Sequence, residues 1–166
     1  MKKIKKICAI FLAAICGLMV GCRPINDIKE ELENSSSAVG GKVGLEILRC
    51  FNEYDSESLK EMYSTFIKNT HDLDSEIEEA FTVIDGEIVS YDNFIIGGEK
   101  NRLEGETVYS DISCTIPVKT SNDENFDICI FYIAVCKNEN KIGLKMVSIF
   151  KEDELICTIG ERKPIT

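Results

Sequence analysis

The sequence lacks an excess of positive charge, because 19 Lys and Arg residues face 29 Asp and Glu residues, for a formal net charge of −10. This sign disfavours contact with a phosphate backbone and argues against a nucleic-acid-binding protein. There is no tryptophan and there are only 3 prolines. A single histidine, His71, and the absence of any C-x-x-C spacing argue against a zinc site. We expect no metal and no cofactor.

The 166 residues are 44% hydrophobic, which suffices for one domain with a single core. The chain is too short for a two-domain enzyme and too apolar for a disordered protein.

The first 22 residues have the pattern of an export signal. Four lysines precede an apolar stretch at 7–20, and Gly21 and Cys22 follow. A basic region, an apolar stretch and small residues at the junction are typical of a secretory signal peptide. The stretch is shorter than the roughly 20 apolar residues that a membrane-spanning helix needs.

The junction LMVGC at 18–22 resembles the signal of bacterial lipoproteins, although Met19 stands where leucine is usual. The resemblance implies cleavage after Gly21 and a diacylglyceryl thioether, a palmitate-type anchor, on Cys22. It predicts an extracytoplasmic location at the cell membrane, with membrane lipid as a partner, since two acyl chains hold a protein stably. An ordinary secreted protein and an uncleaved anchor are the alternatives.

Three segments are therefore expected: a signal peptide at 1–21, a lipidated and flexible tether at 22–42, and a single domain at 43–166. The tether is polar and ends in a serine run and a glycine pair. A mature chain that begins at Cys22 has a net charge of −14. Anionic lipid repels such a domain, so the lipid anchor must hold it.

Five cysteines remain after Cys22, an odd number that does not pair off completely. They lie among apolar residues, which favours buried thiols, with a single disulfide as the alternative. These cysteines are Cys50, Cys114, Cys129, Cys136 and Cys157.

Apolar residues recur at helical spacing in 43–51, 59–67 and 77–84, which predicts three amphipathic helices. Ser58 and Ser75, each followed three residues later by glutamate, fit capping boxes that start the second and third helices. After residue 86 the period changes to two. The expected strands are 87–96, 105–118, 126–136 and 141–150, with a short edge strand at 154–159.

Burial suggests a register for the sheet. With Cys114 opposite Cys129, the apolar residues of neighbouring strands gather on one face. This register predicts that the helices pack on Ile112, Phe131, Ile133 and Leu144.

Three helices before a long antiparallel sheet resemble the cystatin-like cone of nuclear transport factor 2-like and ketosteroid-isomerase-like proteins. The words FNEYD at 51–55, MYS at 62–64, IEEAF at 77–81 and DGEI at 85–88 look like an uncharacterised family of Gram-positive lipoproteins with that fold. The similarity spans 43–150. It implies an α+β domain with three N-terminal helices on a curved sheet of four to five strands. It implies no activity, because this fold hosts enzymes, binders and scaffolds.

Enzymes of this fold use pocket acids with a tyrosine, or a His/Asp pair. Here His71 and Asp72 fall in a polar loop between helices, where we expect solvent exposure. Asp111 and Asp127 lie on strands and are the strand-interior acids that could act as general bases. The register places Asp127 opposite Ile116 near a strand end and Asp111 on the face away from the core, both without a partner. We therefore assign no catalytic residue.

The sequence favours a non-catalytic binding module for a small apolar ligand or another cell-envelope protein. Its pocket is expected to be apolar with a few polar groups such as Ser110 and Ser148. A pocket enzyme of the ketosteroid-isomerase-like type and a pocketless structural domain are the alternatives.

Overall fold

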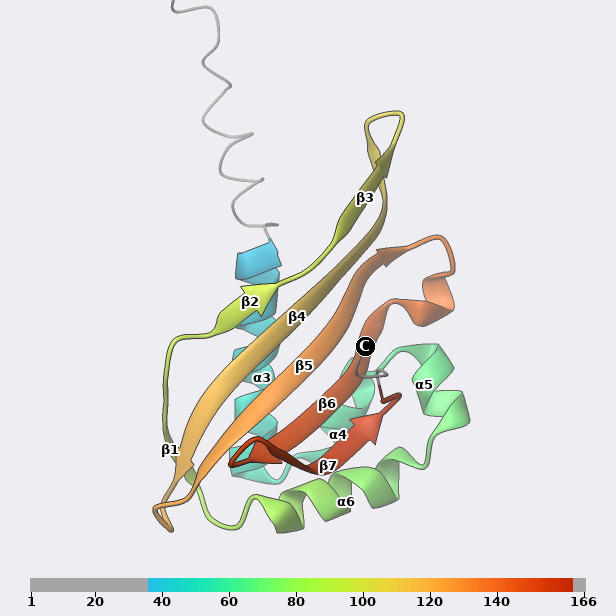
Figure 1. Cartoon of the computed structure of the whole chain (residues 1–166). Coiled ribbons are helices and arrows are strands. Elements are labelled where there is room, and N and C mark those ends of the chain that lie inside the picture. Colours follow the sequence, from blue (N-terminus) through green and yellow to red (C-terminus); the bar gives the residue numbers. More distant parts are fainter. Residues whose placement is uncertain (1–35, 163–166) are drawn as a thin grey trace, which may run out of the picture. The chain divides into compact units, whose positions relative to one another are not determined.

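The computed structural model describes residues 36–162 (Figure 1). The predicted signal peptide, Cys22 as the predicted site of lipid attachment, and the first part of the expected tether lie outside them. Four helices come first: α3 (Ser36–Glu53), α4 (Ser56–Met62), α5 (Thr65–Thr70) and α6 (Leu73–Val83). The strands follow: β1 (Ile88–Tyr91), β2 (Ile95–Gly97), β3 (Lys100–Leu103), β4 (Glu106–Thr120), β5 (Asn125–Cys136), β6 (Gly143–Lys151) and β7 (Glu154–Gly160), with a 3-10 turn, η1 (Glu139–Lys141), before β6.

The strands form one antiparallel sheet in the order β1-β4-β5-β6-β7, and β2 and β3 also pair with β4. The α+β class is confirmed. The expected number of four to five strands is wrong, because the sheet has seven. The 15-residue β4 is long enough to take three successive partners along one edge, so the expected strand 87–96 divides into β1 and β2.

The domain boundary expected at residue 43 falls inside a helix. Residues 36–42, assigned to the tether, form the first turns of α3. Gly40 and Gly44 bring this helix close to the sheet: a Cβ on Gly44 would lie 2.9 Å from Ile116, and one on Gly40 3.0 Å from Ile112. These two glycines therefore serve close packing rather than flexibility.

The helix expected at 59–67 breaks into α4 and α5. At the break Tyr63 forms a parallel bridge with Leu144 of β6, and the Ser64 amide donates to the Leu144 carbonyl at 3.0 Å. This pairing pulls two residues out of helical geometry. As a result Phe66, expected on the buried stripe, is 42% exposed.

The predicted caps were one turn too late. Asp55 caps α4 by accepting the Ser58 amide at 3.0 Å, and Asp72 caps α6 by accepting the Ser75 amide at 3.5 Å. An aspartate three residues before each serine satisfies the first free amides of the helix, so Ser58 and Ser75 lie inside the first turn.

The predicted register of β4 and β5 is wrong by one residue. Cys114 lies opposite Ile130, and Thr115 lies opposite Cys129. This shift places Phe131 and Ile133 on the face opposite Ile112 and Leu144, so the predicted face does not exist as one surface. β5 is apolar on both sides, so its sequence pattern fits either register equally well.

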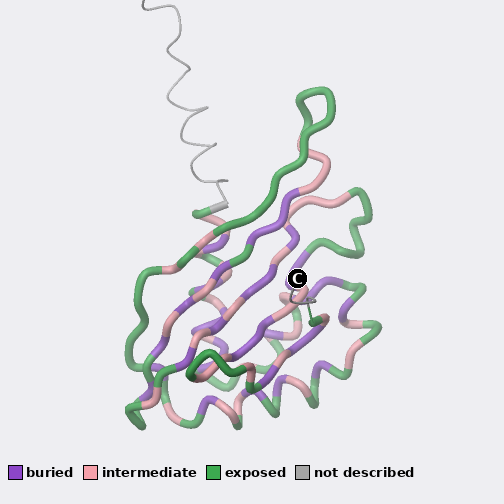
Figure 2. The backbone as a smooth tube through the Cα atoms, viewed as in Figure 1, coloured by how far each residue is buried: buried purple, intermediate pink, exposed green. Residues whose placement is uncertain are grey.

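Buried side chains of the helices and of one sheet face form the core. In Figure 2 the buried stretches lie in these helices and along the strands that they cover. In Figure 1, α3 and α4 lie behind the sheet and α6 runs along β7. Leu59 and Ile77 pack here as expected, and both are fully buried. The fully buried strand residues of this face are Ile116, Ile128, Leu144, Val147, Ile149 and Ile159.

We expect the Asp55 cap to make stability depend on pH. Hydrogen bonds from Ser58, followed by the contact with Arg49 at 3.0 Å, hold the pKa of Asp55 below its ordinary value. A lowered folded-state pKa stabilises the fold fully above about pH 4, and this stabilisation is lost as the pH falls through the folded-state pKa.

The variant Asp55→Asn keeps a capping oxygen but removes the charge. Its melting temperature Tm should lie below that of the wild type at about pH 7, and the two Tm values should converge at about pH 2. Thermal unfolding followed by circular dichroism measures this difference. A difference in Tm that does not change with pH would contradict the role of the Asp55 charge.

Candidate functional site

We call the sheet face that α3 and α4 do not cover the open face. Surface hollows lie on or beside it. Its residues alternate with the core residues along each strand. They include Asp111, Ser113, Thr115, Cys129, Phe131 and Ser148.

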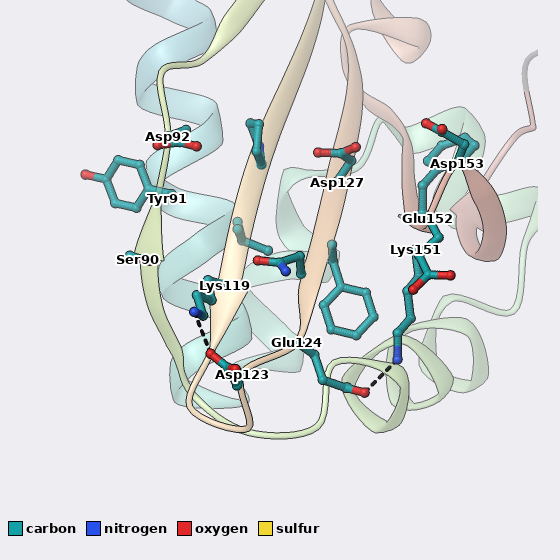
Figure 3. A pocket seen from close by; sticks show the side chains of 15 residues that line it. Ser90, Tyr91, Asp92, Lys119, Asp123, Glu124, Asp127, Lys151, Glu152 and Asp153 are labelled. Carbon is teal, nitrogen blue, oxygen red and sulfur yellow. Dashed lines mark hydrogen bonds and ion pairs between the residues drawn. The ribbon is translucent and has the colours of Figure 1, made fainter.

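An acidic hollow of about 640 Å³ lies at the end of the sheet near the β4–β5 and β6–β7 turns (Figure 3). Its two lysines are neutralised, Lys119 by Asp123 at 2.5 Å and Lys151 by Glu124 at 2.6 Å. Asp127 lies here, opposite Pro117 and not Ile116 as expected. Within residues 36–162 no three side chains are arranged to hold a metal ion, so acidity alone does not define a site.

Two further hollows adjoin each other, because both are lined by Tyr109 and Lys145, and together we call them the Tyr109 groove. Hollow A, of about 540 Å³, is lined by Gly98, Glu99, Tyr109, Asp111, Ser113, Phe131 and Lys145. Hollow B, of about 270 Å³, is lined by Ser64, Phe66, Ile67, Tyr109, Ile133, Cys136, Lys141, Lys145 and Glu161.

Asp111 and Tyr109 form a hydrogen-bonded pair in hollow A. The Tyr109 hydroxyl donates to Oδ2 of Asp111 at 2.9 Å, and the Glu99 amide donates to Oδ1 at 2.8 Å. Asp111 lies on the open face as predicted, but the expectation that it has no partner is wrong. Burial, together with the Asp111 carboxylate, raises the pKa of Tyr109 to about 12. Asp111 thus fixes the orientation of a protonated phenol.

A bulge brings Lys145 into the groove. The pairing of β5 with β6 shifts between Phe131 and Tyr132, so Lys145 adds an extra residue to β6. Its Nζ lies 5.6 Å from the centre of the Phe131 ring and 3.3 Å from Glu161. Sequence reasoning missed this residue, because strict alternation assigns Lys145 no place beside Phe131.

His71 lines none of the three hollows. It caps the C-terminus of α5, and its Nδ1 lies 3.1 Å from Oε1 of Glu76. The other oxygen of Glu76 accepts the Gly160 amide at 2.7 Å. The loop position of His71 was predicted correctly, but the side chain is only 26% exposed because it packs beside this carboxylate.

The five cysteines downstream of Cys22 are free thiols. Burial raises the pKa of Cys50, Cys114 and Cys157 to about 11 and raises that of Cys129 as well. A raised pKa suppresses the thiolate that a cysteine nucleophile requires.

The two serines expected in a pocket lie elsewhere. Ser110 is buried opposite Val135, and Ser148 is buried on the open face, where its hydroxyl contacts Oγ1 of Thr158 at 3.1 Å. Neither serine lines any of the three hollows.

Residues 46–152 match a family model described as a domain of unknown function, DUF5104. The chain belongs to the DUF5104 family. This agrees with the expected membership of an uncharacterised family. The DUF5104 match begins in α3, ends after β6 and contains every lining residue of the Tyr109 groove except Glu161.

A comparison of the chain with curated proteins finds no match. Within the part of the chain that the structure describes, no helix is both long and apolar enough to cross a bilayer.

Proposed function

We propose that this DUF5104 protein is a lipoprotein anchored through Cys22 on the extracytoplasmic face of the cell membrane, and that its domain binds a small ligand in the Tyr109 groove. The observation that carries the binding function is the groove itself. Apolar side chains of hollow B adjoin the hydrogen-bonded polar groups of hollow A, and apolar surface beside a few oriented polar groups is the combination found in ligand sites. The signal-like sequence at 1–22 supports the anchor.

The arrangement of helices followed by an antiparallel sheet supports the cone of nuclear transport factor 2-like proteins. In this chain the interface between helices and sheet is filled by core side chains. We therefore assign the ligand to the open face and not to the space beneath the helices.

Binding without catalysis fits the groove best. Both carboxylate oxygens of Asp111 already accept hydrogen bonds, which leaves the group poorly suited to take a proton from a ligand. The second candidate is a pocket enzyme of the ketosteroid-isomerase-like type. The Tyr109–Asp111 pair favours it, because a protonated phenol can donate to a developing oxyanion if it releases Asp111.

The anchor is tested on the full chain expressed in a bacterial host and extracted from membranes. Mass spectrometry should find a chain that begins at Cys22 and carries the mass of a diacylglyceryl group. The variant Cys22→Ser should lose the lipid, whereas Cys50→Ser should keep it. An intact Met1 or an unmodified Cys22 thiol would show that the anchor is absent.

The binding function is tested by nuclear magnetic resonance with a library of small organic fragments. Fragments that bind should shift the amide signals of Tyr109, Lys145 and their neighbours in the groove. A library whose members shift no groove signal, or shift only signals from other surfaces, would overturn the groove as a ligand site.

A further inference from the structure

We propose that hollow B binds a small carboxylate with an apolar body, whose carboxylate lies between Lys141 and Lys145. This inference rests on the proposed binding function and specifies the chemistry of its ligand. It follows from the charge, the hydrogen-bonding capacity and the size of hollow B.

The charge of hollow B is opposite to that of the chain. Two lysines, Lys141 and Lys145, line it against a single acid, Glu161, in a protein with a net charge of −10. The Lys141 ammonium lies 5.5 Å from the centre of the Phe66 ring. Among residues 36–162, no carboxylate forms an ion pair with Lys141. An anion in hollow B would supply that missing partner.

Lys145 also retains hydrogen-bonding capacity. Its distance of 3.3 Å to Glu161 exceeds the roughly 2.7–2.9 Å of a strong charge-assisted hydrogen bond. The Lys145 ammonium has three N–H donors, and the contact with Glu161 leaves donors available to a ligand. A ligand oxygen between Lys141 and Lys145 would therefore accept hydrogen bonds from both ammonium groups.

Ser64 adds a donor to the lining of hollow B. Its side chain is buried at 3% exposure, and its oxygen accepts the Ile67 amide at 3.4 Å. No hydrogen bond within residues 36–162 uses the Ser64 hydroxyl proton. Hollow B is thus rich in donors, and a carboxylate accepts hydrogen bonds without donating any.

The walls and the volume select the body of the ligand. Ile67, Ile133, Phe66 and Cys136 supply apolar surface. The volume of about 270 Å³ lies just below the range typical of drug-sized ligands, so the ligand is small. The acid Glu161 disfavours a dianion such as phosphate, because its charge adds a repulsion that a monoanion feels less strongly.

The test uses the full chain purified in detergent, with amide signals of hollow B followed by nuclear magnetic resonance. The probes are butanoate, the neutral isostere butanamide and inorganic phosphate. Butanoate should shift the signals of Ile67, Tyr109 and Cys136. Butanamide should bind about tenfold or more weakly, because it lacks the charge. Phosphate should produce no saturable shift.

Variants separate the contribution of Lys141 from general electrostatics. Lys141→Gln should weaken butanoate binding by about tenfold, and Lys141→Arg should retain most of it. Lys119→Gln, in the acidic hollow, is the matched control and should leave binding unchanged. Because Lys141 is exposed, its variants should keep the wild-type Tm.

Equal binding of butanoate and butanamide, or an unaltered affinity in Lys141→Gln, would overturn the carboxylate site. Saturable binding of phosphate at hollow B would overturn the preference for a monoanion. If neutral or cationic fragments bind in the groove and butanoate does not, this inference fails while the proposed binding function stands. If no fragment shifts any groove signal, the binding function itself fails.

Discussion

Replacing Gly160 by alanine should lower the free energy of unfolding by roughly 2–6 kcal/mol, the sum of a strained backbone and an overpacked site. Gly160 has a φ of +82°, a left-handed conformation that favours glycine. A Cβ there would lie 2.4 Å from the Lys145 carbonyl oxygen and 2.9 Å from a ring carbon of Tyr63. The first neighbour is backbone and the second is a buried ring, so neither can move cheaply. Urea denaturation of both proteins measures the change.

Gly105→Ala is the control for this substitution. Gly105 has a similar φ of +90°, but nothing lies within 4 Å of the Cβ that alanine would add. It should therefore cost only the backbone strain, about 1–3 kcal/mol. Equal losses in the two variants would mean that the close contacts at Gly160 contribute nothing.

Ile128→Ala should lower the free energy of unfolding by about 2–5 kcal/mol, the range for truncating a buried isoleucine. Ile128 is fully buried on β5, between Ile116 of β4 and Ile149 of β6. Removing its three outer carbons leaves a void that this packed layer closes only in part. The measurement is again the urea midpoint with an unchanged m value.

Ile95→Ala is the matched control, because Ile95 lies on the edge strand β2 and is 68% exposed. Its substitution should change the free energy of unfolding by no more than about 0.5 kcal/mol. A larger loss in Ile95→Ala than in Ile128→Ala would contradict the assignment of the core to the helix-covered face.

The element types were predictable where periodicity is strong. The strands β4 to β7 were expected within two residues at each end, because alternating or continuous apolar residues are bounded by clear turns. The helix ending near Phe51 and the helix bearing Ile77 were also expected from their stripes. The break at Tyr63 was not, because it depends on pairing with Leu144, which lies far away in the sequence.

The Tyr109 groove could not be predicted, and the reason is local geometry. The register shifts between Ser110 and Asp111 and again between Phe131 and Tyr132, which changes the strict alternation of faces. Alternation without bulges places Lys145 away from Phe131. It does put Tyr109 and Asp111 on the same side of β4, but it does not show the hydrogen bond that joins them. A bulge leaves little trace in a single sequence, so the residues that it gathers are visible only in three dimensions.

The β3–β4 ribbon differs in mechanical character between its tip and its root. β5 begins to pair with β4 only at Tyr109, so Glu106 and Thr107 pair with β3 alone (Figure 1). A two-stranded ribbon without a third strand opens locally at little cost in free energy. Amide hydrogen exchange should therefore be fast along β3 and slow in β5 and β6. Gly98 and Glu99, at the root of this ribbon, border hollow A where β4 also pairs with β5, and the Glu99 carbonyl accepts the Asp111 amide at 3.0 Å. The part of the ribbon that opens therefore ends before the groove, and this wall of hollow A stays rigid.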